Sequence, residues 1–300
     1  MKTKIVYILI CDQDDSFAAI QAVSLYTLRK KHGKDDTSVL TVMDSSTYRI
    51  LEQIKSPILS ESAPVIVDIP PEYNQMQKSR YLKTRLREIV QGDFLFIDGD
   101  TLIADRLDEI DRMDQNTDIA AVSDGHEETR NVGAIDKMPE KCRKAGFSNL
   151  DNEHCFNSGV LFVRDTPVAH DFFRTWHDCW KQSLANGVHF DQPAMWEANR
   201  IMGHPVQEFS GVWNCQFYTK KRENYNRYVK ESKILHYYRT FYHGRLLLSI
   251  IDQVSKTGKV NFKSAVFLQW PRTIVYIMHL SMFKAKLRDS FISGIRSHRK

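Results

Sequence analysis

Strand-like and helix-like segments alternate through the first two hundred residues of this chain, and this alternation constrains the fold more than any other feature. Short apolar runs rich in β-branched residues predict strands, and stretches with apolar residues three or four positions apart predict helices. Alternation of this kind favours an α/β fold with a mostly parallel central sheet and helices on both faces. The expected strands are residues 5–10, 38–43, 65–69, 94–97, 119–122 and 156–163, with a later one at 233–238, and the expected helices are residues 16–31, 47–54, 75–90, 165–184 and 191–200.

The composition indicates an ordinary packed protein of a reducing compartment. Of its 300 residues, 42% are hydrophobic and 26% are charged, which is enough for a buried core and a solvated surface. The five cysteines are an odd number and form no Cys-x-x-Cys pair, which argues against a disulfide framework and against a structural zinc site. The apolar run at residues 5–10 is shorter than the core of a typical signal peptide, so a cytoplasmic protein is expected.

The C-terminal residues differ from the rest of the chain in charge. Residues 256–300 hold ten Lys or Arg and one acid, Asp289, which is a net charge of +9 and leaves −4 on the remainder. Apolar residues at 265–270 and 273–283 lie among these basic residues, but no apolar run reaches the ~20 residues that span a bilayer. This pattern predicts a basic amphipathic helical segment over residues 245–300 that binds an anionic membrane surface. The alternative is a C-terminal helix that packs on the core and carries solvated charges.

The tripeptide Asp98-Gly99-Asp100 follows the short apolar strand expected at residues 94–97. In open α/β sheets, ligands bind outside the carboxyl ends of the strands, so two carboxylates at this point mark a candidate site. The glycine between them allows the backbone to bend and to approach a ligand closely. Hard divalent cations bridge protein carboxylates to substrate phosphates, so the tripeptide suits a metal that holds a nucleotide diphosphate. Taken alone, it fits a β-turn equally well, since Asp and Gly are common turn residues.

A long polar segment at residues 125–151 separates two of the expected strands. It is rich in charged residues and contains Gly133, Pro139 and Gly146. A loop of this length inside a compact domain is usually functional, so we expect a lid or a substrate-binding loop here.

Several motifs, in one order along residues 4–240, resemble the GT-A-fold glycosyltransferases. The likeness is to the retaining family 8 group, which includes glycogenin-like enzymes and lipopolysaccharide galactosyl- and glucosyltransferases. It implies a Rossmann-like nucleotide-diphospho-sugar transferase fold for a catalytic domain over residues 1–244. The matching pieces are residues 12–15 with the helix-forming residues 22–28 behind them, Arg85, Asp98-Gly99-Asp100, Phe156-Asn157-Ser158-Gly159, Asp191-Gln192 and His236.

The resemblance implies a divalent cation held by Asp98, Asp100 and His236. Two carboxylate oxygens and one imidazole nitrogen suit Mn²⁺, with Mg²⁺ and Zn²⁺ as alternatives. Glycosyl transfer from a nucleotide sugar expels a diphosphate, and the cation would neutralise the charge that develops on its oxygens. By itself, His236 also fits an ordinary half-buried histidine at the end of a strand.

The resemblance also implies donor-binding and catalytic residues. In the family, the first strand ends in a turn that contacts the base or ribose, and polar side chains elsewhere bind the hydroxyls of the donor sugar. Arg85 lies at the margin of an apolar helix face and also fits a surface ion pair, whereas Asp191 also fits a helix N-cap. The expected donor-binding residues are Asp12, Asp15, Arg85, Asp98, Gly99, Asn157, Ser158 and Arg239, and the expected catalytic residues are Asp191 and Gln192.

The chain departs from the family pattern after His236. The family has a glycine at the third position after this histidine and a Lys-Pro pair beyond it, and that lysine contacts the donor phosphates. Residues 236–242 read His-Tyr-Tyr-Arg-Thr-Phe-Tyr, so both features are missing. Arg239 or Arg245 could supply the phosphate contact, although the arginine fork is not geometrically equivalent to a lysine.

These features predict a metal-dependent hexosyltransferase that uses UDP-glucose or UDP-galactose in surface polysaccharide or lipopolysaccharide synthesis. The acceptor is expected to be a glycan, lipid-linked and reached at the inner face of the cytoplasmic membrane. Retention by front-face substitution is expected, because the Gln192 amide is a poor nucleophile. The alternatives are an inverting GT-A enzyme with Asp191 as base and a catalytically silent nucleotide- or glycan-binding protein. Nucleic-acid binding is disfavoured, since the aromatic residues of the tail group with aliphatic ones.

Overall fold

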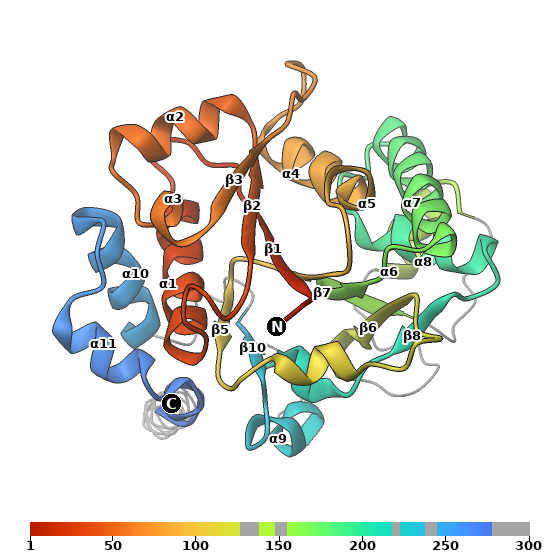
Figure 1. The fold of residues 1–300 in the computed structure, drawn as a ribbon. Coiled ribbons are helices and arrows are strands. Elements are labelled where there is room, and N and C mark those ends of the chain that lie inside the picture. Colours follow the sequence, from red (N-terminus) through yellow and green to blue (C-terminus); the bar gives the residue numbers. More distant parts are fainter. Residues whose placement is uncertain (127–137, 148–154, 218–222, 238–244, 278–300) are drawn as a thin grey trace, which may run out of the picture.

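A seven-stranded mixed sheet lies at the centre of the computed structural model, which describes residues 1–126, 138–147, 155–217, 223–237 and 245–277 (Figure 1). Its strand order among the described residues is β3-β2-β1-β4-β7-β6-β8. Four of the six pairings are parallel, and β7 runs antiparallel to both of its neighbours. The prediction of a mostly parallel α/β sheet is therefore confirmed. The strands are β1 (Lys4–Ile8), β2 (Val39–Met43), β3 (Ala63–Ile66), β4 (Phe94–Ile97), β6 (Ile119–Ser123), β7 (Phe156–Val163) and β8 (Val206–Glu208).

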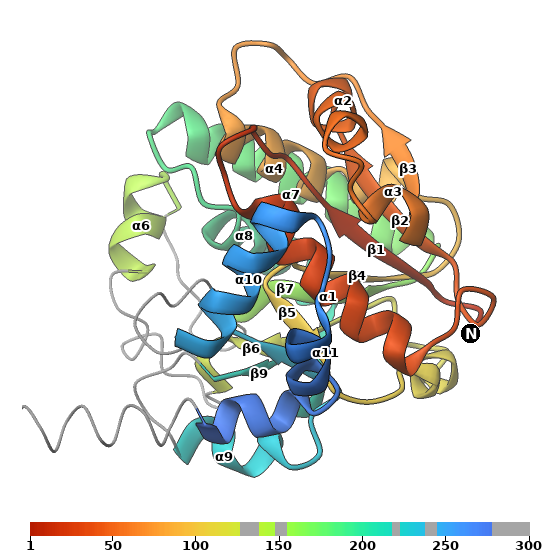
Figure 2. The ribbon, with the colours of Figure 1, turned by 90° about the vertical axis from the view of Figure 1, so that its left-hand side faces the viewer.

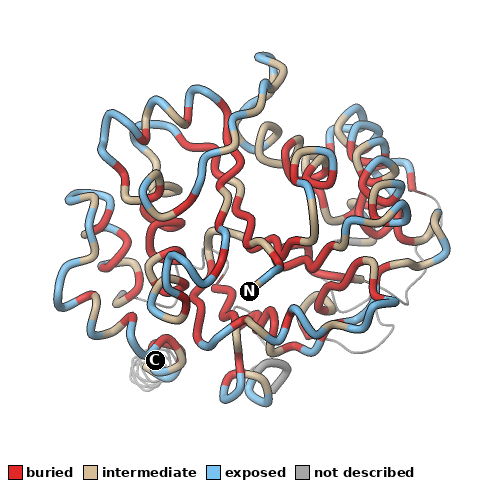
Figure 3. The backbone as a smooth tube through the Cα atoms, viewed as in Figure 1, coloured by how far each residue is buried: buried red, intermediate tan, exposed pale blue. Residues whose placement is uncertain are grey.

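Helices cover both faces of this sheet, and its inner strands, such as β4 and β7, are buried (Figure 3). Side chains alternate between the two faces along a strand, so Ile5 and Tyr7 pack with α1 while Val6 packs on the other side with Trp176 of α7. The two cores thus follow from the unbroken apolar runs that predicted the strands. The helices are α1 (Phe17–Lys31), α2 (Ser45–Gln53), α3 (Ile58–Glu61), α4 (Gln75–Thr84), α5 (Leu86–Ile89), α6 (Met138–Lys144), α7 (Pro167–Ala185), α8 (Gln192–Ile201), α9 (Glu223–Val229), α10 (Arg245–Thr257) and α11 (Phe262–Leu268).

A second, three-stranded sheet lies beside the carboxyl end of β4. It is formed by β5 (Thr101–Ile103), β10 (Ile234–His236) and β9 (Cys215–Gln216), in the order β5-β10-β9. The sequence predicted a strand at the position of β10 but not the two strands that pair with it. Those partners are only two and three residues long, too short to show a hydrophobic period.

Two expected segments differ from the structure. The helix expected over residues 75–90 is broken, since α4 ends at Thr84 and α5 begins at Leu86, with Arg85 between them. The segment expected to be an irregular loop contains a helix, α6, at Met138–Lys144. Residues 127–137 and 148–151 of that segment lie outside the described residues.

The described part of the C-terminal segment packs on the rest of the chain. Leu247, Ile250 and Val254 of α10 are buried in the same core cluster as α1, and Figure 2 shows α10 and α11 on the α1 side of the molecule. Within the residues that the structure describes, no helix is both long enough and apolar enough to cross a bilayer. Residues 278–300, which hold six of the basic residues, lie outside the described part.

Candidate active site

The Asp98-Gly99-Asp100 tripeptide connects β4 of the large sheet to β5 of the small one. The Asp98 backbone N–H donates to the Gly159 carbonyl of β7 at 2.7 Å, which fixes the turn against the large sheet. The antiparallel pairing of β5 with β10 places His236 opposite Thr101, and the Tyr237 N–H donates to the Asp100 carbonyl at 3.1 Å. Residues far apart in the sequence thus meet where the two sheets join.

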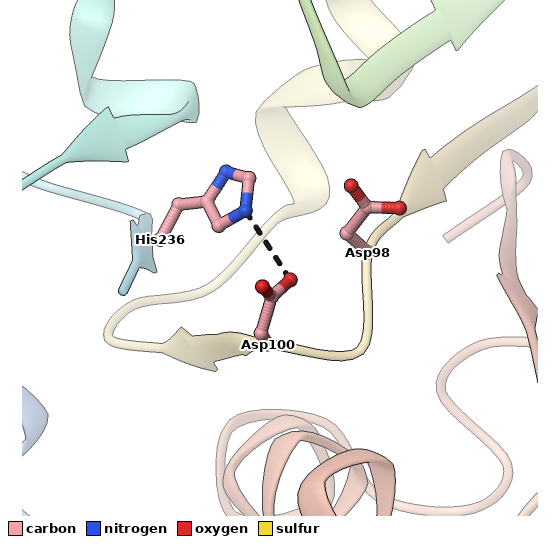
Figure 4. Close-up of side chains that lie close together, drawn as sticks. All are labelled: Asp98, Asp100 and His236. Carbon is pink, nitrogen blue, oxygen red and sulfur yellow. Dashed lines mark ion pairs between the residues drawn. The ribbon is translucent and has the colours of Figure 1, made fainter. Parts of the chain in front are cut away.

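The predicted metal ligands Asp98, Asp100 and His236 come together in the structure (Figure 4). Their ligand atoms all lie within 4.8 Å of one another, and the His236 Nε2 is 3.2 Å from an Asp100 carboxylate oxygen. A Cβ atom on Gly159 would lie 2.4 Å from the His236 ring, so only glycine lets the imidazole reach this position. Two carboxylates and one imidazole are a donor set that fits a divalent metal.

The two carboxylates of this cluster are half-buried, and their pKa values shift in opposite directions. Burial raises the pKa of Asp98 above its ordinary value, although Lys83 acts in the opposite direction. Burial would raise the pKa of Asp100 too, but the facing His236 imidazole holds it below the ordinary value. The same pairing raises the pKa of His236 against the effect of burial. The Asp100 carboxylate also raises the pKa of Asp98, as expected for two acids that share one site.

A second cluster, built around Lys83 and Asp191, adjoins the candidate metal ligands. The buried Lys83 ammonium lies 3.2 Å from an Asp98 oxygen, 3.3 Å from the Ser158 hydroxyl and 3.4 Å from an Asp191 oxygen. Arg80 lies 3.2 Å from the other Asp191 oxygen, and Ser158 donates to Asp191 at 2.7 Å. Burial would raise the pKa of Asp191, but Lys83 and Arg80 hold it far below the ordinary range.

Lys83 and Arg80 were missed in the sequence, and Arg85 was expected in their place. Arg85 instead donates to Glu88 at 2.7 Å and to the Tyr81 hydroxyl, and neither of these lies in the cluster. Arg85 stands at the break between α4 and α5 and forms an ion pair with Glu88, which is the alternative arrangement that the sequence allowed. The sequence contains only a weak indication of Lys83. This residue lies three positions before the buried Leu86, a spacing that places both on the inward side of a helix.

The predicted catalytic pair and sugar-binding turn also lie in this region. Asp191 occupies the N-cap position of α8, but its side chain makes no capping bond and faces Arg80 instead. Gln192 donates through its amide to the Phe156 carbonyl at 3.2 Å. Asn157 is buried at the start of β7, next to Ser158 of the Lys83 cluster. The structure therefore brings Asn157, Ser158, Asp191 and Gln192 together with the metal ligands.

The acidic turn after β1, residues 12–15, differs from the Asp98-Gly99-Asp100 turn in the partners of its carboxylates. The Asp15 carboxylate accepts from the backbone N–H groups of Asp12 at 2.7 Å and of Phe17 at 2.8 Å, and the Gln75 amide donates to it as well. Its oxygens thus stabilise the turn and the start of α1, whereas the Asp12 side chain is exposed. Gly99 lies in the metal turn as expected, and Arg239 lies outside the described residues.

Comparisons with known proteins agree on one family. The sequence model of glycosyl transferase family 8 matches residues 18–241. Comparison with curated proteins gave no match. Galactosyltransferase LgtC in complex with donor and acceptor sugar analogs is 16% identical, with a TM-score of 0.57 over 87% of this chain and 98% of that one.

Two further solved structures share the fold at low sequence identity. The bifunctional glycosyltransferase WbbM is 14% identical, with a TM-score of 0.55 over 79% of this chain, which spans only 45% of the WbbM chain. Mouse xyloside xylosyltransferase 1 is 14% identical, with a TM-score of 0.51 over 79% of this chain and 98% of that one. Since the family model covers most of the chain and the site lies where the fold places it, the protein belongs to glycosyltransferase family 8 and has the GT-A fold.

Proposed function

We propose that this protein transfers a hexose from UDP-glucose or UDP-galactose to a glycan acceptor, with retention and with a divalent metal. The observation that carries the proposal is the convergence of Asp98, Asp100 and His236, whose ligand atoms lie within 4.8 Å of one another at the end of β4. The relatives add support, since LgtC is a galactosyltransferase and WbbM a glycosyltransferase.

The charges of the site fit a metal-bound diphosphate. Asp98, Asp100 and Asp191 carry three negative charges against the two positive charges of Lys83 and Arg80. With a neutral His236, the cluster therefore has a net charge of −1 and does not attract a diphosphate. A divalent cation such as Mn²⁺ would reverse that sign and, as a Lewis acid, stabilise the leaving diphosphate. The same chemistry can use Mg²⁺, so metal identity is part of the proposal.

The environment of Asp191 favours retention over inversion. An inverting enzyme needs a base that takes a proton from the acceptor hydroxyl, and efficient bases have a pKa near the working pH. Asp191 is buried between Lys83 and Arg80, which hold its pKa far below that range, so it is a weak base. We assign Asp191 to charge balance beside the donor and Gln192 to positioning, with proton transfer assisted by the leaving phosphate.

Release of UDP tests the activity. The whole chain is supplied with UDP-glucose or UDP-galactose, first after EDTA treatment and then with Mn²⁺ or Mg²⁺ restored. We expect metal-dependent UDP release with at least one donor, and an α-linked product from these α-linked donors by NMR. A β-linked product would identify an inverting enzyme, and tight UDP binding without turnover of any donor would identify a silent binding protein.

We also propose that the protein docks on the inner face of the cytoplasmic membrane through its C-terminal segment, which brings it to a lipid-linked acceptor. Phe262 and Trp270 are 86% and 64% exposed. In the sequence, Phe262 lies between Lys259 and Lys263, and Trp270 lies two residues before Arg272. Exposed aromatic side chains among lysines are typical of interfacial segments. This combination, with the +9 charge of residues 256–300, supports the proposal.

Vesicle flotation tests the docking by substitution, because removal of α10 would expose the core that it shares with α1. The variant Phe262→Ser with Trp270→Ser should float less with vesicles that contain phosphatidylglycerol. Ile201→Ser is the matched control, since Ile201 is also exposed, at 54%, but lies at the end of α8. Equal flotation of all three proteins would contradict the docking proposal.

A further inference from the structure

A chain of buried side-chain amides connects the metal ligand His236 to the sugar-binding turn. The His236 Nδ1 lies 3.0 Å from the Asn214 Oδ1, and the Asn214 Nδ2 donates to the Asn157 Oδ1 at 2.9 Å. The Asn157 Nδ2 in turn donates to an Asp124 carboxylate oxygen at 2.9 Å. Asn214 and His236 are both fully buried, so Asn214 is held in the protein interior between two residues of the site.

The hydrogen-bond direction in this chain is fixed at its Asn157 end. The Gly159 backbone N–H points at Asn157 from 2.9 Å, and a backbone N–H can only donate, so the facing Asn157 atom is Oδ1. Asn214 must then present its Nδ2 to that oxygen, which leaves its Oδ1 facing His236. An amide oxygen can only accept, and the His236 Nδ1 therefore carries a proton.

We propose that Asn214 is a positioning residue, which holds His236 with its proton on Nδ1 so that Nε2 offers its lone pair to the metal. The inference rests on the proposed metal-dependent function and names the residue that prepares one of its ligands. The geometry agrees, because the Nε2 faces Asp100, the neighbouring ligand, at 3.2 Å. Partners of this kind orient ligating histidines and fix their tautomer, and their loss typically costs 10–100-fold in metal affinity.

The hydrogen bond to Asn157 gives Asn214 a second structural role. Asn157 belongs to the turn expected to bind the donor sugar, so Asn214 joins the metal side of the site to the sugar side. Gly159 supports both halves, since its N–H fixes Asn157 and its missing side chain makes room for the His236 ring. The metal ligand and the sugar-binding amide therefore hold their positions through one buried asparagine.

The tautomer can be observed in the wild-type, metal-free protein without any variant of Asn214. Long-range ¹H–¹⁵N spectra of ¹⁵N-histidine-labelled protein in alkaline buffer separate imidazoles that are protonated on Nδ1 from those protonated on Nε2. Comparison with His236→Gln identifies the signal of His236 among the 11 histidines. We expect a proton on Nδ1. A proton on Nε2 would overturn the inference.

Mn²⁺ binding, measured by calorimetry and electron paramagnetic resonance, tests the role of Asn214. Asn214→Leu should weaken Mn²⁺ binding about 10–100-fold, whereas Asn214→Asp, which keeps an oxygen opposite the His236 Nδ1, should restore most of it. Asn199→Leu is the matched control, because Asn199 is also buried and donates to a histidine Nδ1, of His204, at 3.4 Å, away from the site. Circular dichroism verifies the fold of each variant.

The outcomes separate this inference from the proposed function. Wild-type affinity for Mn²⁺ in a folded Asn214→Leu protein would overturn the inference alone. No binding of Mn²⁺ by the wild-type protein, with or without UDP, would overturn the proposed metal-dependent function, and this inference with it. Equal weakening by Asn214→Leu and Asn199→Leu would show a general effect of core asparagines and would also overturn it.

Discussion

Two acidic turns at the same edge of the central sheet make opposite use of their carboxylates. The turn after β1 contains Asp12 and Asp15, and the turn after the neighbouring parallel strand β4 contains Asp98 and Asp100. Both were expected to bind the donor. In the first turn the Asp15 oxygens accept from backbone N–H groups of their own turn, whereas in the second the carboxylates face Lys83 and His236. The Asp15 carboxylate thus binds mainly backbone groups beside it, with Gln75 as a further donor, whereas Asp98 and Asp100 face the charged or ligating side chains of the candidate site.

The largest expected effect is at the second turn. Asp98→Asn and Asp100→Asn should each lower kcat/KM for the UDP-sugar about a thousandfold, since loss of metal coordination removes several kcal/mol of transition-state stabilisation. Initial rates with saturating Mn²⁺ measure the effect, and thermal unfolding verifies the fold. Near-wild-type rates in both variants would remove the metal assignment and, with it, the contrast between the two turns.

A smaller effect on kcat/KM is expected for Lys83, and almost none for Arg85. Lys83→Met should lower kcat/KM about 100-fold, because it removes a buried cation that faces both Asp98 and Asp191. Arg85→Met is the matched control and should change kcat/KM less than about threefold, since its partner Glu88 forms a surface ion pair with it. The reverse order of effects would mean that Arg85, as the sequence suggested, contacts the donor.

The smallest expected effect is at the turn after β1, and it is a change in the free energy of unfolding. Asp15→Ala should lower the free energy of unfolding by about 1 kcal/mol, because it removes the acceptor of the Asp12 and Phe17 backbone N–H groups. Chemical denaturation measures it. Asp12→Ala is the control: its side chain is exposed, so it should leave stability unchanged and raise KM for the donor if it contacts the base or ribose. Equal stability of the two variants would contradict the structural role of Asp15.

The sequence was sufficient for the parts of the site that follow a regular element. Asp98 and Asp100 come directly after a buried strand, Ser158 lies near the start of β7, and Asp191 immediately precedes α8. Lys83 was missed because the resemblance pointed to Arg85, which the structure places at the break between α4 and α5. Asn214 stands between a short 3₁₀ turn and a two-residue strand, where no period marks the side chain that points to His236.

The linkage between Mn²⁺ and UDP tests the central claim most directly, because the proposed metal holds the diphosphate at Asp98, Asp100 and His236. UDP affinity of the wild-type protein is measured by calorimetry with and without Mn²⁺, and Mn²⁺ affinity with and without UDP. We predict that each ligand tightens the other about tenfold or more, by the same factor in both directions, and that Asp98→Asn abolishes this coupling. UDP affinity that is identical with and without Mn²⁺ would contradict the account.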